Sequence, residues 1–232
     1  MTDSSIPKRR EFLGKVAAGA IALGMSGGFT KVLAEDRFVL RDTVPSDKWL
    51  EALTGKYRQF FDMPNHENGM GLLHVRNYLN TMRDTYGVTH PKVTAVVGLY
   101  GGSTMLGFND AMWKKYGLGN PTKAMNGSNA PADANIFNAA PAGSNALSMT
   151  GAPIPIPADS SISSLQQRGA VFILCNNAFN VWMGLLGGGD AAKTTALRNE
   201  FAANMLPGVH LVPAMVVAIN QAQMHGCTYM YL

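Results

Sequence analysis

Cysteine is scarce in this sequence, which has only Cys175 and Cys227 among 232 residues. Neither cysteine belongs to a Cys-x-x-Cys pair, and this excludes covalent haem attachment and the common cysteine-based zinc sites. The five histidines form no His-Glu-x-x-His pattern. We therefore predict no metal and no cofactor, and we expect His66 and His74 to lie on the surface.

Three signatures of common enzyme classes are also absent. No Gly-Lys-Ser/Thr follows the glycines at 101 and 102, so the sequence has no P-loop. No Gly-x-Gly-x-x-Gly follows the first expected strand, so a dinucleotide site has no support. Residues 35–232 contain no Gly-x-Ser-x-Gly elbow to carry the nucleophile of a serine hydrolase.

Charged residues make up only 15% of the sequence, although its pI of about 9.1 is basic. The basic excess is local, because residues 1–34 hold five basic and two acidic side chains. Residues 35–232 carry 14 basic and 13 acidic side chains, which is close to neutral. The pI is therefore no argument for binding to nucleic acid or to a membrane, and we expect no nucleic-acid partner.

The N-terminus is typical of an export signal. Paired arginines at 9 and 10, followed by Phe12-Leu13, resemble the twin-arginine signal, and a mild apolar stretch follows from Val16 to Phe29. We predict cleavage after Ala34 and a periplasmic protein; the alternative is a basic helix that stays attached. The stretch is too short and too rich in glycine for a membrane span, so none is expected after signal removal.

The remaining chain is long enough and apolar enough for one core. Residues 35–55 are polar and mixed, and we expect an extension on the surface or against a partner. In residues 56–232, apolar runs alternate with amphipathic stretches, which predicts a three-layer α/β sandwich on a mostly parallel sheet. The expected strands are 56–61, 93–100, 169–175, 209–213 and 227–232.

Apolar stripes and helix-end residues place the helices. We expect Asn68 to cap a helix that Gly87 ends. Gly101–Ser103 is expected to turn into one continuous helix with Met105, Phe108, Met112 and Tyr116 on one side. Shorter helices are expected after Asp159, Cys175 and Asp190, and from Met215 to Gln223.

Residues 120–159 differ in composition from the rest of the chain. They hold six of the twelve prolines and only three charged side chains, and they follow no helix or strand period. We interpret this segment as a long insertion. Such loops are usually functional or are ordered by a neighbouring subunit.

The central feature of the sequence is the apolar run that ends at Cys175. A run of this kind, bounded by Gly169 and followed by a helical pattern, is typical of a strand buried on both faces. Chemistry in parallel sheets gathers where strands end, and a helix N-terminus favours thiolate over thiol. Cys175 is therefore the candidate catalytic residue; the alternative is a small buried apolar side chain.

Two short polar segments are candidates for ligand binding beside Cys175. The backbone N–H groups of Gly101, Gly102 and Ser103 could cradle an anion, or this could be a tight structural turn. Asn176 and Asn177 could hold a sulfur adduct or could cap the following helix. Because Cys175 closes one strand and Cys227 opens another, parallel strands place them at opposite edges, and we predict two free thiols.

With its elements in this order, residues 56–232 resemble the DsrE/DsrF-like (YchN-like) sulfur-relay family, in its exported branch. The resemblance rests on Phe60–Asp62, Val97–Gly102, Asn109–Trp113 with the Lys-Tyr-Gly that follows, Gly169–Asn177, and Pro207–Pro213 with the helix and strand after it. It implies a compact flavodoxin-like α/β domain that assembles into trimers or hexamers.

The resemblance also implies a function. Several members carry sulfur as a persulfide on a cysteine after a central strand, and Cys175 occupies a similar position. This implies a sulfur carrier or sulfurtransferase-like protein whose partners are a sulfur donor or acceptor protein or a small sulfur compound. The second hypothesis is a non-catalytic oligomeric binding or accessory subunit of the same fold. The sequence departs from the compact members of this family in one respect, because its 120–159 segment is longer than their fold requires.

Overall fold

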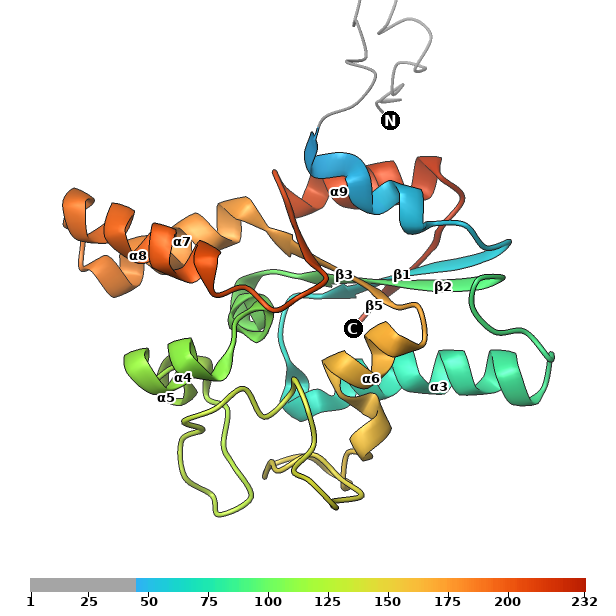
Figure 1. The fold of residues 1–232 in the computed structure, drawn as a ribbon, viewed down its shortest axis with the longest axis horizontal. Helices are drawn as coiled ribbons and strands as arrows, with labels where there is room; N and C mark the ends of the chain where they lie inside the picture. Colours follow the sequence, from blue (N-terminus) through green and yellow to red (C-terminus); the bar gives the residue numbers. More distant parts are fainter. Residues whose placement is uncertain (1–44) are drawn as a thin grey trace, which may run out of the picture. The chain divides into compact units, whose positions relative to one another are not determined.

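The structure is a computed structural model that describes residues 45–232 (Figure 1). The expected export signal and residues 35–44 of the expected extension lie outside these residues. The described chain forms one five-stranded sheet in the order β4-β3-β2-β1-β5. Its strands are β1 (Tyr57–Met63), β2 (Val93–Leu99), β3 (Val171–Cys175), β4 (Val209–Val212) and β5 (Thr228–Tyr231).

The prediction of an α/β sandwich is confirmed, and every strand pair in the sheet is parallel. The strand order differs from the 2-1-3-4-5 order of flavodoxin, because β1 to β4 follow one another across the sheet and β5 returns to the free side of β1. Crossovers between parallel strands are right-handed. The strand order runs one way across the sheet from β1 to β4 and the other way from β4 to β5. The helix between β4 and β5 therefore lies on the opposite face from the helices of the earlier crossovers.

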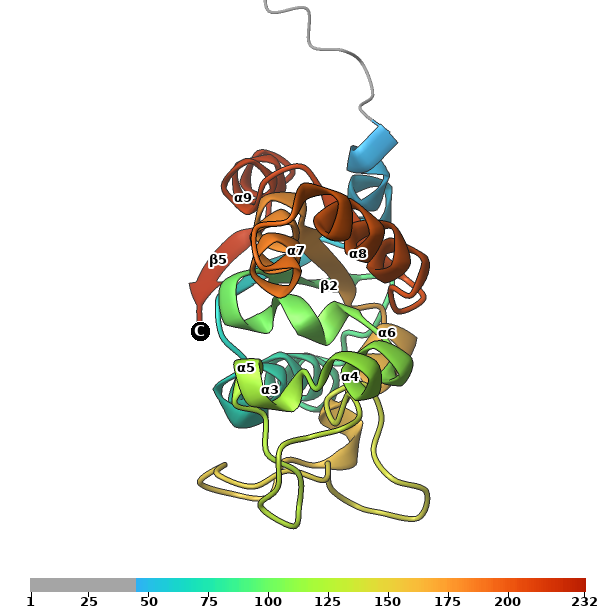
Figure 2. The ribbon, with the colours of Figure 1, turned by 90° about the vertical axis from the view of Figure 1, so that its left-hand side faces the viewer.

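The helices follow this rule (Figures 1 and 2). The helix α9 (Met215–Met224) and the 3-10 helix η1 (Pro45–Ala52) lie on one face. The other face carries α3, α6 and the segments between β2 and β3. The remaining elements are η2 (Glu67–Gly69), α3 (Met70–Asp84), η3 (Gly101–Gly107), α4 (Asp110–Tyr116), α5 (Gly119–Thr122), η4 (Ala158–Ser160), α6 (Ile162–Gln167), α7 (Asn176–Gly187) and α8 (Ala191–Ala203).

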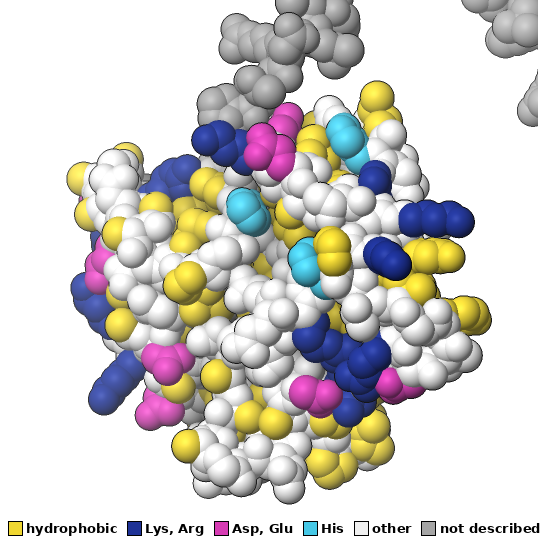
Figure 3. Space-filling view, turned by 45° about the vertical axis from the view of Figure 1, so that its right-hand side comes forward, with side chains coloured by type: hydrophobic (Ala, Val, Ile, Leu, Met, Phe, Trp, Pro, Cys, Tyr) yellow, Lys and Arg dark blue, Asp and Glu magenta, His cyan; other side chains and the backbone are white. Residues whose placement is uncertain are grey.

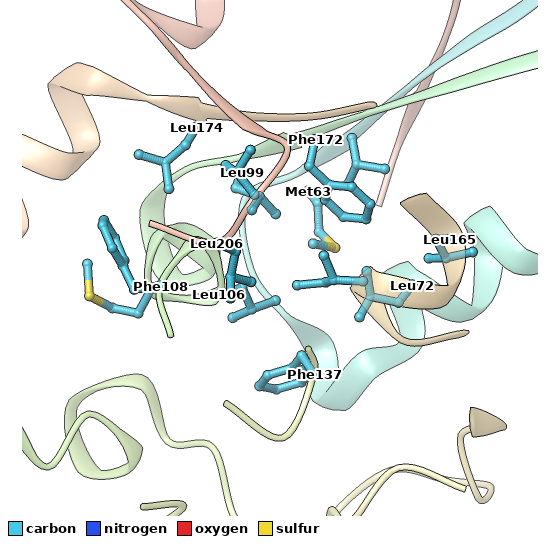
Figure 4. Packing of buried hydrophobic residues seen from close by; sticks show 14 of the residues in the cluster. Met63, Leu72, Leu99, Leu106, Phe108, Phe137, Leu165, Phe172, Leu174 and Leu206 are labelled. Atoms are coloured by element: carbon cyan, nitrogen blue, oxygen red, sulfur yellow. The ribbon is translucent and has the colours of Figure 1, made fainter. Parts of the chain in front are cut away.

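The larger core lies on the face of the sheet that α3 covers (Figure 4). Phe172 of β3 and Leu72 of α3 are fully buried there. Phe108 lies among aromatic rings, with its centroid 5.1 Å from Phe179 and 5.0 Å from Phe201. These contacts join η3, α7 and α8 into one apolar unit.

The smaller core lies under α9 and corrects the expectation for residues 35–55. Trp49 of η1 is 1% exposed and Leu53 is 5% exposed, in one cluster with Phe60 and Met215. The described end of this segment is therefore part of the domain. The sequence did not indicate this, because Trp49 and Leu53 lie among mostly polar residues.

Two expectations about helix ends are wrong. Gly69, in the left-handed conformation, precedes α3, while Asn68 lies inside η2 with φ of 47°. The expected helix after Gly101 is also broken at Phe108, which is extended, and α4 restarts with Asn109 as its N-cap. The Asn109 side chain accepts from Met112 N at 3.3 Å, and this local bond competes with a continuous helix.

The insertion forms no named strand and has helical turns only at its ends, as its composition predicts. It is nevertheless tied to the core. Asn135 Nδ2 donates to the carbonyl oxygens of Leu106 and Phe108, each at 2.8 Å, and Phe137 is 1% exposed. Within residues 45–232, no helix is long and apolar enough to cross a membrane.

The aromatic contacts of Phe108 give a stability prediction. Phe108→Ala should lower the free energy of unfolding by about 3–5 kcal/mol, because it removes a fully buried ring and leaves a cavity. Urea unfolding measures this change. Tyr86→Ala, at a ring that is 67% exposed, is the control and should change the same quantity by less than about 0.5 kcal/mol. Equal losses of unfolding free energy in the two variants would contradict the stabilising role given to the Phe108 ring.

Candidate functional site

Cys175 lies where the sequence predicts it. It is the last residue of β3, and α7 begins at the next residue. Its side chain is 5% exposed and belongs to the smaller core. The parallel register sets Cys175 beside Val212 at the end of β4. Cys175 is therefore at the carboxyl edge of the sheet, where ligands of parallel α/β proteins gather.

The Cys175 sulfur accepts two backbone N–H bonds. Ala178 N, in the first turn of α7, lies 3.5 Å from Sγ. Met215 N, at the first residue of α9, lies 3.3 Å from Sγ. The sulfur therefore faces the N-termini of two helices from different parts of the chain. The partial positive charge of each helix N-terminus attracts an anionic group.

A small pocket opens beside this sulfur. It has a volume of about 190 Å³ and an almost wholly apolar surface, and its lining residues include Tyr100, Asn177 and Cys175 itself. The other lining residues are Ala214, Met215, Val216 and Ile219. The pocket gives a small molecule a route to a side chain that is otherwise buried.

The two asparagines after Cys175 have different surroundings. Asn177 is exposed and lines the pocket. Asn176 is half-buried, and its Oδ1 accepts from Arg198 at 2.7 Å. Neither caps α7, because the Cys175 sulfur itself accepts the capping N–H.

The Gly101–Ser103 segment forms a tight turn held by its own bonds. Ser103 is fully buried, its N–H is directed at the carbonyls of Pro64 and Tyr100, and its hydroxyl donates to the Met63 carbonyl. A Cβ at Gly101 would lie 2.9 Å from Pro64 O, so glycine is required there. Trp182 of α7 donates to Gly101 O at 2.7 Å, which brings this turn against the helix that follows Cys175.

Sequence reasoning missed a buried acid near this site. Asp62, close to the end of β1, is 3% exposed; its Oδ2 accepts from the Tyr229 hydroxyl at 2.5 Å, whereas Oδ1 has no hydrogen-bond partner among residues 45–232. The hydrogen bond to Asp62 raises the pKa of Tyr229 to about 12. Burial, and then Asp62, raise the pKa of Tyr100 above its ordinary value. The sequence held one sign of this buried acid, because Asp62 lies between the apolar residues Phe61 and Met63 of a strand.

The prediction of two free thiols is confirmed. Cys227 precedes β5 at the opposite edge of the sheet, and burial raises the pKa of its thiol. The expectation for His74 is confirmed, because it is exposed, but that for His66 is wrong. His66 is 8% exposed, accepts from Asn68 N at 3.1 Å and bonds Thr122 O at 2.8 Å. Residues 45–232 hold no group of three or more His, Cys, Asp or Glu suited to a metal ion.

Comparisons with known proteins identify no family. No family model matches the chain, and no curated protein matches it. Among solved structures, the chain is similar to a protein of unknown function, MTH1491, from Methanobacterium thermoautotrophicum. The match has 18% identity and a TM-score of 0.40, and it covers 76% of this chain and all of the other.

The Tyr229–Asp62 bond predicts a pH dependence. The pKa of Tyr229 is higher in the folded protein, at about 12, than its ordinary value of 10.0, so its contribution is complete below pH 10.0 and is lost as the pH rises toward 12. Tyr229→Phe should lower the free energy of unfolding by about 1 kcal/mol at neutral pH. Above pH 10, the variant should lose less stability than the wild type does. Thermal unfolding against pH measures both effects.

Tyr231→Phe is the matched control, since Tyr231 is 65% exposed and on the same strand. This variant should still lose stability above pH 10, as the wild type does. The Tyr78 phenol also contributes to that loss, because burial raises the pKa of Tyr78 to about 12. An unchanged pH profile in Tyr229→Phe would contradict the role given to the Asp62 bond.

Proposed function

We propose that this protein carries sulfane sulfur as a persulfide on Cys175. The observation that supports it is the pair of N–H bonds from two helix N-termini to one sulfur atom at the wall of a small pocket. Such donors stabilise negative charge on sulfur, whether the sulfur is a thiolate or the terminal atom of a persulfide held nearby.

The proposed chemistry is redox-neutral. The Cys175 thiolate attacks the outer sulfur of a donor persulfide, R–S–SH. A sulfur–sulfur bond to Cys175 forms as the donor's own sulfur–sulfur bond breaks, and R–S⁻ leaves with the electron pair. The product is Cys175–S–SH, and attack by an acceptor thiolate reverses the sequence. With thiosulfate as donor, sulfite is the leaving group.

The remaining expectations are part of the same proposal. The protein is exported by the twin-arginine pathway to the periplasm, forms a homo-oligomer such as a trimer or hexamer, and exchanges sulfur with a donor or acceptor. The apolar side chains exposed on α7 and α9 support assembly through this side: Val181 at 63%, Leu185 at 70%, Val216 at 77% and Met224 at 70%. They also support the second candidate, a non-catalytic binding or accessory subunit, because Val216 lines the pocket.

Intact mass spectrometry tests the carrier. The purified protein is incubated with polysulfide or thiosulfate and compared with Cys175→Ser and Cys227→Ser. We expect a gain of one or more sulfur atoms in the wild type and in Cys227→Ser, removed by reductant and absent from Cys175→Ser. No adduct in the wild type, with Cys175 unreactive until the protein unfolds, would overturn the proposal and favour the accessory subunit.

The role of the α9 N–H can be isolated with two variants in a Cys227→Ser background. Met215→Pro removes the N–H, and proline is tolerated at the first helical position after an extended residue such as Ala214. Met215→Ala loses the same side chain but keeps the N–H. Alkylation of Cys175 by iodoacetamide should be about tenfold slower in Met215→Pro than in Met215→Ala, as expected for losing a bond to a charged group. Equal rates in the two variants would show that this N–H does not activate the sulfur.

A further inference from the structure

A larger pocket lies at the opposite edge of the sheet, where the strands begin. Its volume is about 370 Å³, and its lining residues are Leu79, Arg83, Thr89, His90, Val93, Gln167 and Arg168. Val93 is the first residue of β2, whereas Cys175 is the last residue of β3. The two pockets share no lining residue. This site is therefore separate from the proposed sulfur chemistry.

The lining of this pocket combines an apolar part with hydrogen-bond donors. Leu79 and Val93 are 3% and 1% exposed and form the apolar part. The polar groups are two guanidinium groups, an imidazole, an amide and a hydroxyl, and no carboxylate lines the pocket. A ligand with a negatively charged end and an apolar body matches this distribution.

The charges around the pocket leave one arginine without an acidic partner. Arg76 pairs with Asp159, and Arg83 forms two bonds with Asp84 at 2.6 and 2.9 Å. Arg168 instead donates to the neutral Asn80 Oδ1 at 2.8 Å, and within residues 45–232 it has no ion pair. A group of basic side chains flanked by acidic ones is visible on this side of the molecule (Figure 3).

The half-buried Arg168 lies near charges of both signs, none of which forms an ion pair with it within residues 45–232. Burial is the largest cause that lowers its pKa; Arg83 and Arg76 also lower it, whereas Asp159 and Asp84 raise it. An arginine still remains protonated in proteins. An anion in the pocket would give Arg168 an ionic partner, and the planar guanidinium group offers it two parallel N–H donors.

The wall of the pocket is fixed before any ligand binds. Gly169, next to Arg168, has φ of +88°, and a Cβ there would lie 2.2 Å from His90 Nδ1. Only glycine lets the imidazole approach this closely. The loop that carries His90 is closed by Lys92 N donating to Thr89 O at 2.9 Å. The backbone therefore holds the imidazole wall of the pocket in place, which lowers the entropic cost of binding.

We propose that this pocket binds a small organic oxyanion. The guanidinium group of Arg168 binds the oxyanion, and Leu79 and Val93 contact the apolar body. A phosphate ester and a carboxylate share this chemistry, because both offer the paired oxygens that a guanidinium group binds.

Nuclear magnetic resonance titration of the full-length protein tests the site, with phenyl phosphate and benzoate as separate probes and inorganic phosphate as the probe without an apolar body. We expect saturable shifts of the backbone amides of Thr89, His90, Gln167 and Arg168 with at least one organic probe. Inorganic phosphate should bind more weakly. The stronger organic probe identifies the oxyanion that the pocket prefers.

Arg168→Gln should weaken binding by at least about tenfold, because it removes the bidentate donor. Lys193→Gln changes the net charge equally at an exposed position on α8, and it should leave the affinity within about twofold. If Arg168→Gln does not fold, Arg168→Lys keeps the charge but loses the planar fork and should weaken binding less. Shifts that do not saturate with any probe, or equal weakening in Lys193→Gln, would overturn the proposal.

Discussion

The candidate site depends on one sulfur atom that faces the N-termini of two helices. The helix α7 begins directly after Cys175, so its contact with the sulfur is local. The helix α9 begins 40 residues later, and its contact requires the whole topology. Because the sheet reverses direction after β4, the right-handed crossover carries α9 to the other face, where its first N–H meets the sulfur. A rule of chain handedness therefore determines the electrostatics of the site.

Most of the fold could be predicted from the sequence because parallel strands buried on both faces are continuous apolar runs. The run before Cys175 is such a strand, and glycines mark the ends of several helices. The continuous helix through Phe108 was wrong because apolar spacing fits the helical period across a break, even where Asn109 caps a new helix through Met112 N. The helix start at Asn68 was wrong because Asn68 belongs to η2 and Gly69 precedes α3.

The candidate site was predictable only in part. The position of Cys175 follows from strand order alone, so the sequence was sufficient. The Met215 N–H, the Tyr100 phenol and the buried Asp62 come together through strands and helices distant in the chain. No local pattern identifies backbone N–H groups or a single acid as partners. The arginine pocket was missed for the same reason, because Arg83 and Arg168 belong to different helical segments.

The position of β5 also has a consequence for how the chain folds. This strand pairs with β1, and Tyr229 bonds Asp62 across 167 residues of sequence. During synthesis β1 can pair with β2 early, but its other edge stays open until β5 emerges from the ribosome. Pairings this distant in sequence slow folding, and an unpaired strand edge invites association with other chains. Factors that shield nascent chains would protect this edge, and the last strand would complete both the sheet and the environment of Asp62 in a single late step.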